Sequence, residues 1–468
     1  MKLNYKRTIL VGMAFFLISA FWQAYDAIVP LILTNHFGLP QSASGAVMSI
    51  DNVLAVFMLP IFGALSDKVN TKFGKRTPFI VFGAIAAVIA FVSLTFIDNY
   101  QLAKVVAAGI PSLEQGALSD EAFQELVRKT TVELTIANPM PLVGFIGTLL
   151  VVLIAMATFR SPAVALMPDV TVKPLRSKGN AIINLMGTAG GILVLVLGII
   201  FKTGAAGKTD FLAYVIAVCA VMVVGLVVFL VTVKEPLWVK QMEEDTVKYG
   251  IEESAPTEDT AGKRGLTKDE MTSLVLILAS VALWYIGYNA VTSKYSVYAE
   301  QVLHVDFNTT LIVAQAAAII SYIPVGIVSS KVGRRKAILT GIVMLTSAFT
   351  IAIFLTKVSS ELMMFPIFAL AGIGWATINV NSFPMVVELA KVGDTGKYTG
   401  YYYTASMAAQ IVTPVLSGIL VDAVGWGIFF PYAAIFAALS FVTMFFVKHG
   451  DSKPEAKKSV LEALDVDD

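Results

Sequence analysis

The chain is built from long apolar runs that short polar segments separate. A helix needs about 20 predominantly apolar residues to cross the hydrocarbon core of a bilayer. Twelve runs reach this length, and they cover residues 8–34, 43–65, 78–97, 141–167, 180–201, 211–233, 272–299, 309–330, 337–356, 362–387, 399–421 and 427–447. The pattern therefore predicts an all-α membrane protein with twelve transmembrane helices.

Composition supports a membrane protein and excludes several other classes. Of the 468 residues, 57% are hydrophobic and only 14% are charged, whereas soluble chains carry about 25% charged residues. The net charge of +1 argues against a nucleic-acid partner. Cys219 is the single cysteine, so no disulfide can form within the chain, and the three histidines are far apart in the sequence. We expect no metal site and no cofactor.

The basic residues predict the orientation of the helices, because Lys and Arg concentrate in short cytoplasmic loops. They precede the first apolar run and follow the second, fourth, eighth and tenth. Both termini are therefore expected on the cytoplasmic side of the cell membrane. The first run carries Gln23 and Asp26 and no small-residue cleavage signal follows it, so it is expected to remain as a helix.

The spacing of the runs predicts two six-helix halves. Residues 1–233 form the first half, 234–270 a charged cytoplasmic linker, 271–448 the second half and 449–468 a cytoplasmic tail. Within the first half, residues 98–138 form a long extracellular loop. Ser119 is expected to cap a short helix that ends near residue 134. This helix either packs over the outer mouth or takes part in substrate selection.

A loop motif recurs at the same place in both halves. Gly63-Ala-Leu-Ser-Asp67-Lys-Val leads to Gly74-Lys75-Arg76, and Gly326-Ile-Val-Ser-Ser-Lys-Val leads to Gly333-Arg334-Arg335-Lys336. A carboxylate beside cations at the membrane surface suggests a latch that breaks when the halves move, although the basic residues also serve as topology anchors. The predicted cytoplasmic gate consists of Asp67, Lys75, Arg76, Asp169, Arg334, Arg335 and Glu388.

The first copy of this motif resembles the loop signature of the major facilitator superfamily. Its longer form, GALSDKVNTKFGKRTPFI, is similar to the sucrose–proton symporters and to the wider glycoside–pentoside–hexuronide cation symporters. A second block, from Arg160-Ser-Pro to Pro168-Asp169, resembles the region from the fourth to the fifth span of those carriers. The resemblance implies two pseudo-symmetric six-helix bundles that take up a disaccharide or other glycoside with a cation, most often H⁺.

The chain departs from this family at one place that bears on the cation. The melibiose-type sodium carriers have two carboxylates on the second span, and the corresponding positions here are Ala55 and Leu59. Asp51 lies about one turn earlier. We therefore expect H⁺ as the coupling ion, with Na⁺ the less favoured alternative.

Three charged residues stand out as candidates inside predicted spans, where a charge costs a few kcal/mol and needs a partner or a purpose. They are Asp26, Asp51 and Arg160. Trp22, Tyr25 and Asp26 follow helical spacing, so aromatic rings and a carboxylate share one face, as suits a sugar. We hypothesise that Arg160 competes with a proton for Asp51 or Asp26 and that sugar binding shifts the balance. The alternative is a set of structural ion pairs.

The predicted sites combine these charges with aromatic and amide residues of both halves. Proton coupling is assigned to Asp26, Asp51 and Arg160. Substrate binding is assigned to Trp22, Tyr25, Asp26, Asn52, Arg160, Tyr288, Asn289, Trp375 and Asn379.

The predicted function is H⁺-coupled symport of a small sugar or glycoside by alternating access. An exporter of drugs or metabolites with the same fold and a sugar sensor that does not transport remain as alternatives. An enzyme is not expected, because the sequence has no His-Glu-x-x-His, Gly-x-Ser-x-Gly or P-loop motif. Besides the substrate, the expected partner is the lipid bilayer, and a monomer suffices for this fold.

Overall fold

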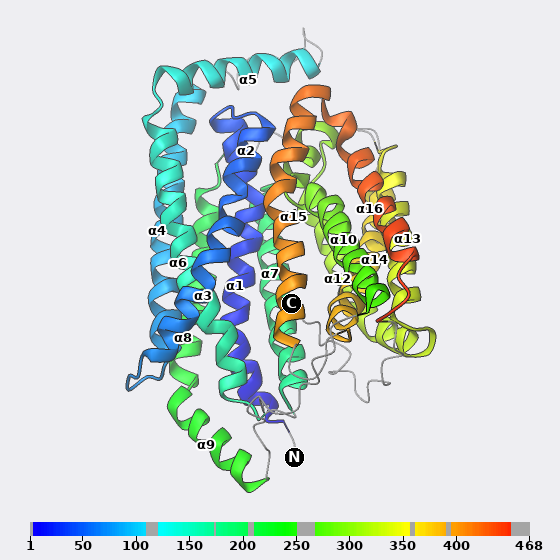
Figure 1. Ribbon diagram of the computed structural model, residues 1–468. Coiled ribbons are helices and arrows are strands. Elements are labelled where there is room, and N and C mark those ends of the chain that lie inside the picture. The colour runs from blue at the N-terminus through cyan, green and yellow to red at the C-terminus, as the bar shows by residue number, and fades with distance from the viewer. Residues whose placement is uncertain are drawn as a thin grey trace.

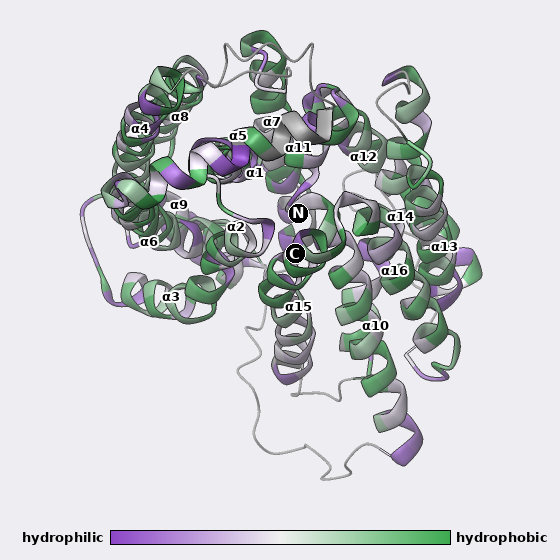
Figure 2. Cartoon of the chain, turned by 90° about the horizontal axis from the view of Figure 1, so that it is seen from above, coloured by the Kyte–Doolittle hydropathy of each residue, from purple (hydrophilic) through white to green (hydrophobic). Residues whose placement is uncertain are grey.

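The computed structural model describes residues 3–108, 120–172, 175–204, 210–249, 267–355, 361–389 and 395–450. These residues are almost entirely helical, and the helices form a bundle whose long axes run roughly parallel (Figure 1). Seen from above, helices of the first half lie on one side and helices of the second half on the other (Figure 2). Residues 250–266 of the predicted linker and residues 451–468 of the predicted tail lie outside the described residues.

The first half contains nine α-helices and a π-helical turn within the described residues. Their bounds are α1 Tyr5–Leu31, η1 Ile32–His36, α2 Gln41–Met48, α3 Ile50–Lys68, α4 Thr77–Ala107, α5 Asp120–Ala137, α6 Met140–Asp169, α7 Arg176–Phe201, α8 Leu212–Thr232 and α9 Glu235–Lys248.

The second half begins at a helix with a complete capping box. The Thr267 side chain accepts from the Glu270 backbone N–H, and the Glu270 carboxylate accepts from the Thr267 N–H. The elements are α10 Lys268–Thr292, α11 Tyr295–Tyr298, η5 Ala299–Leu303, α12 Phe307–Val332, α13 Arg334–Ala352, α14 Glu361–Val387, α15 Thr395–Val424, η6 Trp426–Ile428 and α16 Phe429–Phe445.

Eleven of the described helical stretches are long and apolar enough to cross a membrane. The predicted run at 309–330 corresponds to α12, which has 26 residues and includes the shorter apolar stretch Phe307–Tyr322. Large apolar side chains point outward from the bundle, as Phe57, Phe82 and Val231 do with exposed fractions of 63%, 69% and 73%. The predicted all-α membrane fold is confirmed.

Two helices end elsewhere than predicted. The run expected at 78–97 continues as α4 to Ala107, because the polar residues after it are not solvated: Asp98 is fully buried and its carboxylate lies 2.5 Å from His36 Nδ1. The run expected at 272–299 ends as α10 at Thr292. Lys294 then turns away, and its Nζ donates to the Gln41 carbonyl of the other half.

The second predicted span is interrupted near its beginning, between α2 and α3. Ser49 separates α2 from α3, and its single O–H is shared between the Gly45 carbonyl at 2.8 Å and the Ile411 carbonyl of α15 at 2.9 Å. A hydroxyl that bonds back to the preceding turn bends a helix. The break places Asp51 in the first turn of α3, where the positive end of the helix dipole favours a carboxylate.

One helix lies in the predicted extracellular loop, as expected, and another lies in the linker, for which no helix was predicted. α5 follows the predicted short helix closely, although its expected cap Ser119 lies outside the described residues, and it crosses one end of the bundle (Figure 1). α9 extends from the other end, within the predicted linker. Arg7 holds α9 to α1, since its guanidinium lies 4.9 Å from the centre of the Trp238 ring.

The two ends of the bundle differ in how the halves meet. We call the end that carries Asp67, Arg76 and Arg334 the motif face, and the other end the opposite face. At the opposite face α2 packs on α15, and both Asp422 carboxylate oxygens accept, at 2.7 Å each, from the N–H groups of Gln41 and Ser42 at the start of α2. A helix N-terminus from one half is thus capped by a carboxylate from the other.

Candidate functional site

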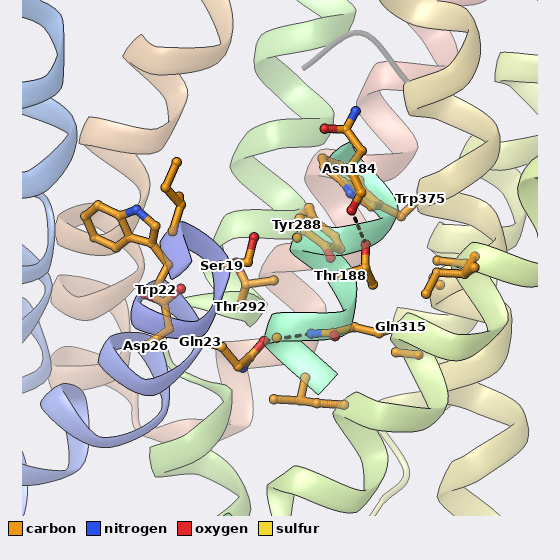
Figure 3. Close-up of a pocket in the computed structure, with 18 of the residues that line it drawn as sticks. Ser19, Trp22, Gln23, Asp26, Asn184, Thr188, Tyr288, Thr292, Gln315 and Trp375 are labelled. Carbon is orange, nitrogen blue, oxygen red and sulfur yellow. Dashed lines mark hydrogen bonds between the residues drawn. The ribbon is translucent and has the colours of Figure 1, made fainter. Parts of the chain in front are cut away.

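A cavity of about 1130 Å³ lies between the two halves (Figure 3). Residues of α1, α6 and α7 line it on one side, and residues of α10, α12 and α14 line it on the other. Among the described lining residues, Asp26 is the single acid and Arg160 the single base. A cavity between two repeated halves is the place where secondary transporters bind their substrates.

Helix α1 supplies the aromatic and acidic part of the cavity. Trp22, Gln23 and Asp26 line it, and the Asp26 side chain is exposed to the cavity although its neighbours are packed. The Trp22 ring meets Phe21 and Tyr25 edge to face, with ring centroids 5.3 Å apart in each pair. These contacts fix the orientation of the indole toward the cavity.

The second half supplies a pair of stacked rings. Tyr288 of α10 and Trp375 of α14 lie parallel within 4°, with centroids 3.6 Å apart, and both line the cavity. Tyr285 meets the Trp375 ring edge to face at 5.2 Å. The predicted cavity residues Tyr288 and Trp375 therefore form one rigid aromatic surface (Figure 3).

The three predicted coupling residues are not joined by an ion pair. Arg160 lines the cavity together with Asp26, whereas Asp51 lies behind the lining in the first turn of α3. Among the described residues, no hydrogen bond or ion pair links Arg160 to either carboxylate, but Arg160 acts on Asp51 electrostatically. Asn52 donates to Asp51 at 2.8 Å. Asp51 is thus held by an amide, and the guanidinium remains available to the cavity.

Four predicted substrate-binding residues lie outside the lining, namely Tyr25, Asn52, Asn289 and Asn379. Tyr25 is fully buried against Phe21 and Trp22, and its hydroxyl has no hydrogen-bond partner among the described residues. Asn289 is also away from the cavity and its amide nitrogen is buried without a partner in the described part of the chain. Asn379 accepts from the Ser382 hydroxyl through its backbone carbonyl.

A polar stripe on α7 was not predicted from the sequence. Asn180, Asn184 and Thr188 line the cavity, and Thr188 donates to the Asn184 carbonyl at 3.0 Å (Figure 3). Their spacing of four residues places them on one helix face. Polar residues that recur every fourth position in an apolar span were a signal from which this face could have been predicted.

A cross-half amide pair was also missed. Gln315 of α12 donates to Gln23 of α1, with 2.7 Å between Nε2 and Oε1 (Figure 3). Gln23 stands in the α1 segment that drew attention to Trp22 and Asp26. Gln315 is an isolated amide in an apolar run, and its partner could not be found without the fold.

The ion pairs of the motif face each form within one half. The Arg76 guanidinium lies 2.5 Å from Asp67 and 2.8 Å from Asp169, and Arg334 pairs with Glu388. Arg335 donates to the backbone carbonyl of Phe445. These pairs join the loop motifs to the neighbouring helices of the same bundle.

Glu235, at the start of α9, completes the motif in the first half. Its carboxylate accepts from the backbone N–H groups of Lys75, Arg76 and Thr77 at 2.6 to 2.9 Å and from the Thr77 hydroxyl at 2.7 Å. These groups begin α4, which has no cap of its own. Gly74 has φ +111°, and a Cβ added there would lie 2.2 Å from the Glu235 carboxyl carbon, which explains the glycine.

Comparison with protein families agrees with this geometry. The family model described as "MFS/sugar transport protein" matches residues 10–111, and the model described as "Major Facilitator Superfamily" matches residues 307–464. One match lies in each half. Each half thus contains a segment similar to the major facilitator superfamily, whose members are membrane transporters rather than enzymes.

Its sequence is similar to two curated bacterial proteins over short segments. It is 28% identical over 120 residues to the "Uncharacterized symporter YnaJ" of Bacillus subtilis (strain 168), covering 22% of this chain and 26% of that protein. It is 33% identical over 64 residues to the "Putative glycoside/cation symporter YagG" of Escherichia coli (strain K12), covering 14% of each. The matched segments span about a quarter or less of these relatives.

Solved structures share the fold over nearly the whole chain. The inward-open xylose transporter XylE from E. coli superposes with a TM-score of 0.62 at 14% identity, covering 98% of this chain and 99% of that one. A D-xylose–proton symporter gives 0.63 at 15% identity, covering 96% and 99%. The predicted major facilitator fold is confirmed.

Proposed function

We propose that this protein carries a disaccharide or other glycoside together with H⁺ by alternating access. The observation that supports this most is the composition of the cavity between the halves. It combines flat aromatic rings with one carboxylate, one guanidinium and several amides and hydroxyls. The partial similarity to a putative glycoside/cation symporter supports the same substrate class, and the xylose transporters that share the fold carry a sugar.

The two sides of a pyranose ring suit the two kinds of lining. Trp22 and the stacked Tyr288–Trp375 pair offer aromatic faces for the C–H groups of a sugar. Asp26 accepts from sugar hydroxyls, whereas Arg160 donates to sugar oxygens. Asn184 and Thr188 on α7 add neutral partners. A lipophilic drug would leave these polar groups without partners, which costs binding free energy.

Coupling to H⁺ rests on Asp26, with Arg160 and Asp51 as its partners. Asp26 is the cavity carboxylate, so a proton and a sugar both reach it from the same space. Arg160 carries no ion pair to it in this state. Protonation of Asp26 neutralises the cavity acid, and we infer that this change permits the halves to rock with sugar bound. Asp51 lies behind the lining and acts on the site through its electrostatic attraction to Arg160.

The opposite face is closed in this state, because α2 of the first half packs there on α15 of the second half. If the motif face is cytoplasmic, as the basic loops predict, this state precedes or follows release of sugar to the cytoplasm. Opening the opposite face requires the contacts of α2 with α15 to separate.

The proposal is tested by uptake of labelled sucrose and labelled maltose into proteoliposomes. An inward H⁺ gradient or an inward Na⁺ gradient is imposed in parallel. We expect accumulation with the H⁺ gradient that an uncoupler abolishes. Accumulation with Na⁺ alone would overturn the H⁺ assignment, and failure to accumulate either sugar with either gradient would overturn the proposed substrates.

A further inference from the structure

Gln23 and Gln315 form a direct amide bridge between the two halves inside the cavity. Gln315 Nε2 donates to Gln23 Oε1 at 2.7 Å, and both side chains are half-buried and line the cavity (Figure 3). One amide comes from α1 and the other from α12. The bridge therefore joins the halves at the place where the substrate is expected.

The bridge uses only part of the hydrogen-bonding capacity of the two amides. A glutamine side chain has two N–H donors and one carbonyl acceptor with two lone pairs. Among the described residues, the Gln23 amide nitrogen and the Gln315 amide oxygen make no further hydrogen bond. A donor and an acceptor thus remain side by side. Two neighbouring hydroxyls of a sugar match this set, because one accepts while the other donates.

Gly191 of α7 leaves room beside the bridge. A Cβ added at Gly191 would lie 3.6 Å from Gln315 Oε1 and 3.7 Å from Gln23 Oε1, which is ordinary van der Waals contact. Gly191 also lines the cavity. The missing side chain gives a ligand access to both amides at once.

The bridge also belongs to the set of contacts that must separate when the opposite face opens. Farther toward that face, Asn308 of α12 donates to Thr203 beyond the end of α7, and Asn35 donates to Glu300. These bonds likewise join one half to the other. Separation of α1 from α12 breaks the Gln23–Gln315 bond and leaves two amides to be satisfied.

We propose that the Gln23–Gln315 bridge is a specificity-determining element that recognises a pair of adjacent sugar hydroxyls. The hydroxyls replace the amide–amide bond, so a correct sugar satisfies both glutamines when the halves separate. A sugar that lacks one of these hydroxyls leaves an amide without a partner. This inference rests on the proposed function, because it assumes a hydroxyl-rich substrate.

The test compares sugars that differ by one hydroxyl. Uptake of labelled sucrose or maltose, whichever the wild type accumulates, is competed with its monodeoxy analogues in the wild type, in Gln23→Met, in Gln315→Met and in the double variant. We expect the wild type to reject at least one analogue by roughly tenfold or more relative to the parent sugar. Each single variant should reduce this discrimination to within about threefold, and the double variant should add little.

Two further variants separate recognition from a structural role. Gln410→Met removes an amide from α15 away from the cavity lining and should keep the discrimination. Gly191→Leu keeps both glutamines but fills the space beside them and should lose it. If the glutamine variants weaken uptake of all sugars by the same factor, the bridge only holds the halves together and the inference is wrong. Failure of the wild type to accumulate either sugar would instead refute the proposed function itself.

Discussion

Asp26 and Arg160 are the two residues on which the proposed transport mechanism depends most. Both are charged, and both line a cavity in which no other described lining residue is charged. A charge inside a membrane protein is retained only where it has a partner or a purpose. Because the two do not form an ion pair with each other in this state, the substrate and the proton are the partners that we propose.

Replacing Asp26 with Asn removes the proton site but keeps the size and one acceptor of the side chain. We expect H⁺-driven accumulation of sugar to fall at least roughly tenfold, while exchange of labelled for unlabelled sugar persists. Uptake and counterflow in proteoliposomes measure the two. Asp245→Asn on the exposed side of α9 is the matched control. Full accumulation by both Asp26→Asn and Asp51→Asn would refute the coupling scheme.

The sequence allowed part of this site to be predicted. Charged residues and tryptophans stand out in apolar runs, so the sequence predicts Trp22, Asp26, Arg160 and Trp375 as site residues. Tyr25 and Asn289 also interrupt the apolar runs, but they lie outside the cavity lining. The sequence does not say which side of a helix faces the cavity when all sides are apolar. Gln315 was missed because its role depends on a contact 292 residues away.

At the scale of elements, the close contact between α2 and α15 requires glycine at two positions. A Cβ on Gly45 of α2 would lie 2.0 Å from the Pro414 carbonyl oxygen of α15, and a Cβ on Gly418 would lie 2.3 Å from the Gln41 carbonyl oxygen. Both approaches involve backbone atoms that cannot move independently. The closed opposite face therefore depends on these two glycines.

We expect Gly45→Ala and Gly418→Ala to open the opposite face and slow transport by roughly tenfold or more, since overpacking a tight contact costs about 1–3 kcal/mol. Gly400→Ala lies on the same helix α15 with no atom within 4 Å of the added Cβ, and it should leave transport unchanged. Initial uptake rates compare the three variants. Equal rates in all of them would contradict the closed contact described here.

Glu235 of α9 also joins two elements, because its carboxylate caps the N-terminus of α4. Glu235→Ala leaves the first N–H groups of α4 without an acceptor, and we expect a loss of about 1–3 kcal/mol of stability. Thermal unfolding in detergent should show a lower midpoint for Glu235→Ala. Glu244→Ala on exposed α9 should not change it. An unchanged midpoint for Glu235→Ala would mean that water replaces the carboxylate without cost.

Most helices could be predicted because an apolar run must reach about 20 residues to cross the bilayer as a helix. The exceptions have physical causes. α4 continues past its apolar run because Asp98 finds a buried partner in His36. The break at Ser49 depends on a hydroxyl that bonds to another helix, and α9 lies in a polar segment without a strong apolar pattern.

At the scale of the whole molecule, the closed opposite face contains a buried lysine. Lys294 lies beyond the end of α10, is 2% exposed and donates to the Gln41 carbonyl at 2.8 Å. Burial lowers the pKa of its amine from 10.5 to about 8, and nearby Asp422 opposes this shift. When the face opens and water reaches Lys294, its pKa should return to the ordinary value.

The closed state thus binds fewer protons than the open state between about pH 8 and 10.5. Raising the pH through this window should favour closure by up to about tenfold per pH unit, because the states differ by at most one proton. Below about pH 8 this group should have no effect. Spin labels at the exposed ends of α5 and α15, at Ile136→Cys and Val424→Cys in a Cys219→Ser chain, report the opening. Lys294→Met should remove the pH dependence, and persistence of the dependence in that variant would assign it to another group.

In the proposed mechanism, sugar and H⁺ move together through the cavity between the halves. The pH inside proteoliposomes, recorded when sucrose or maltose is added outside with no gradient imposed, tests this coupling. We predict that the sugar which is transported acidifies the lumen, and that Asp26→Asn abolishes the acidification while sugar exchange continues. Sugar that enters without any change in luminal pH would contradict the claim.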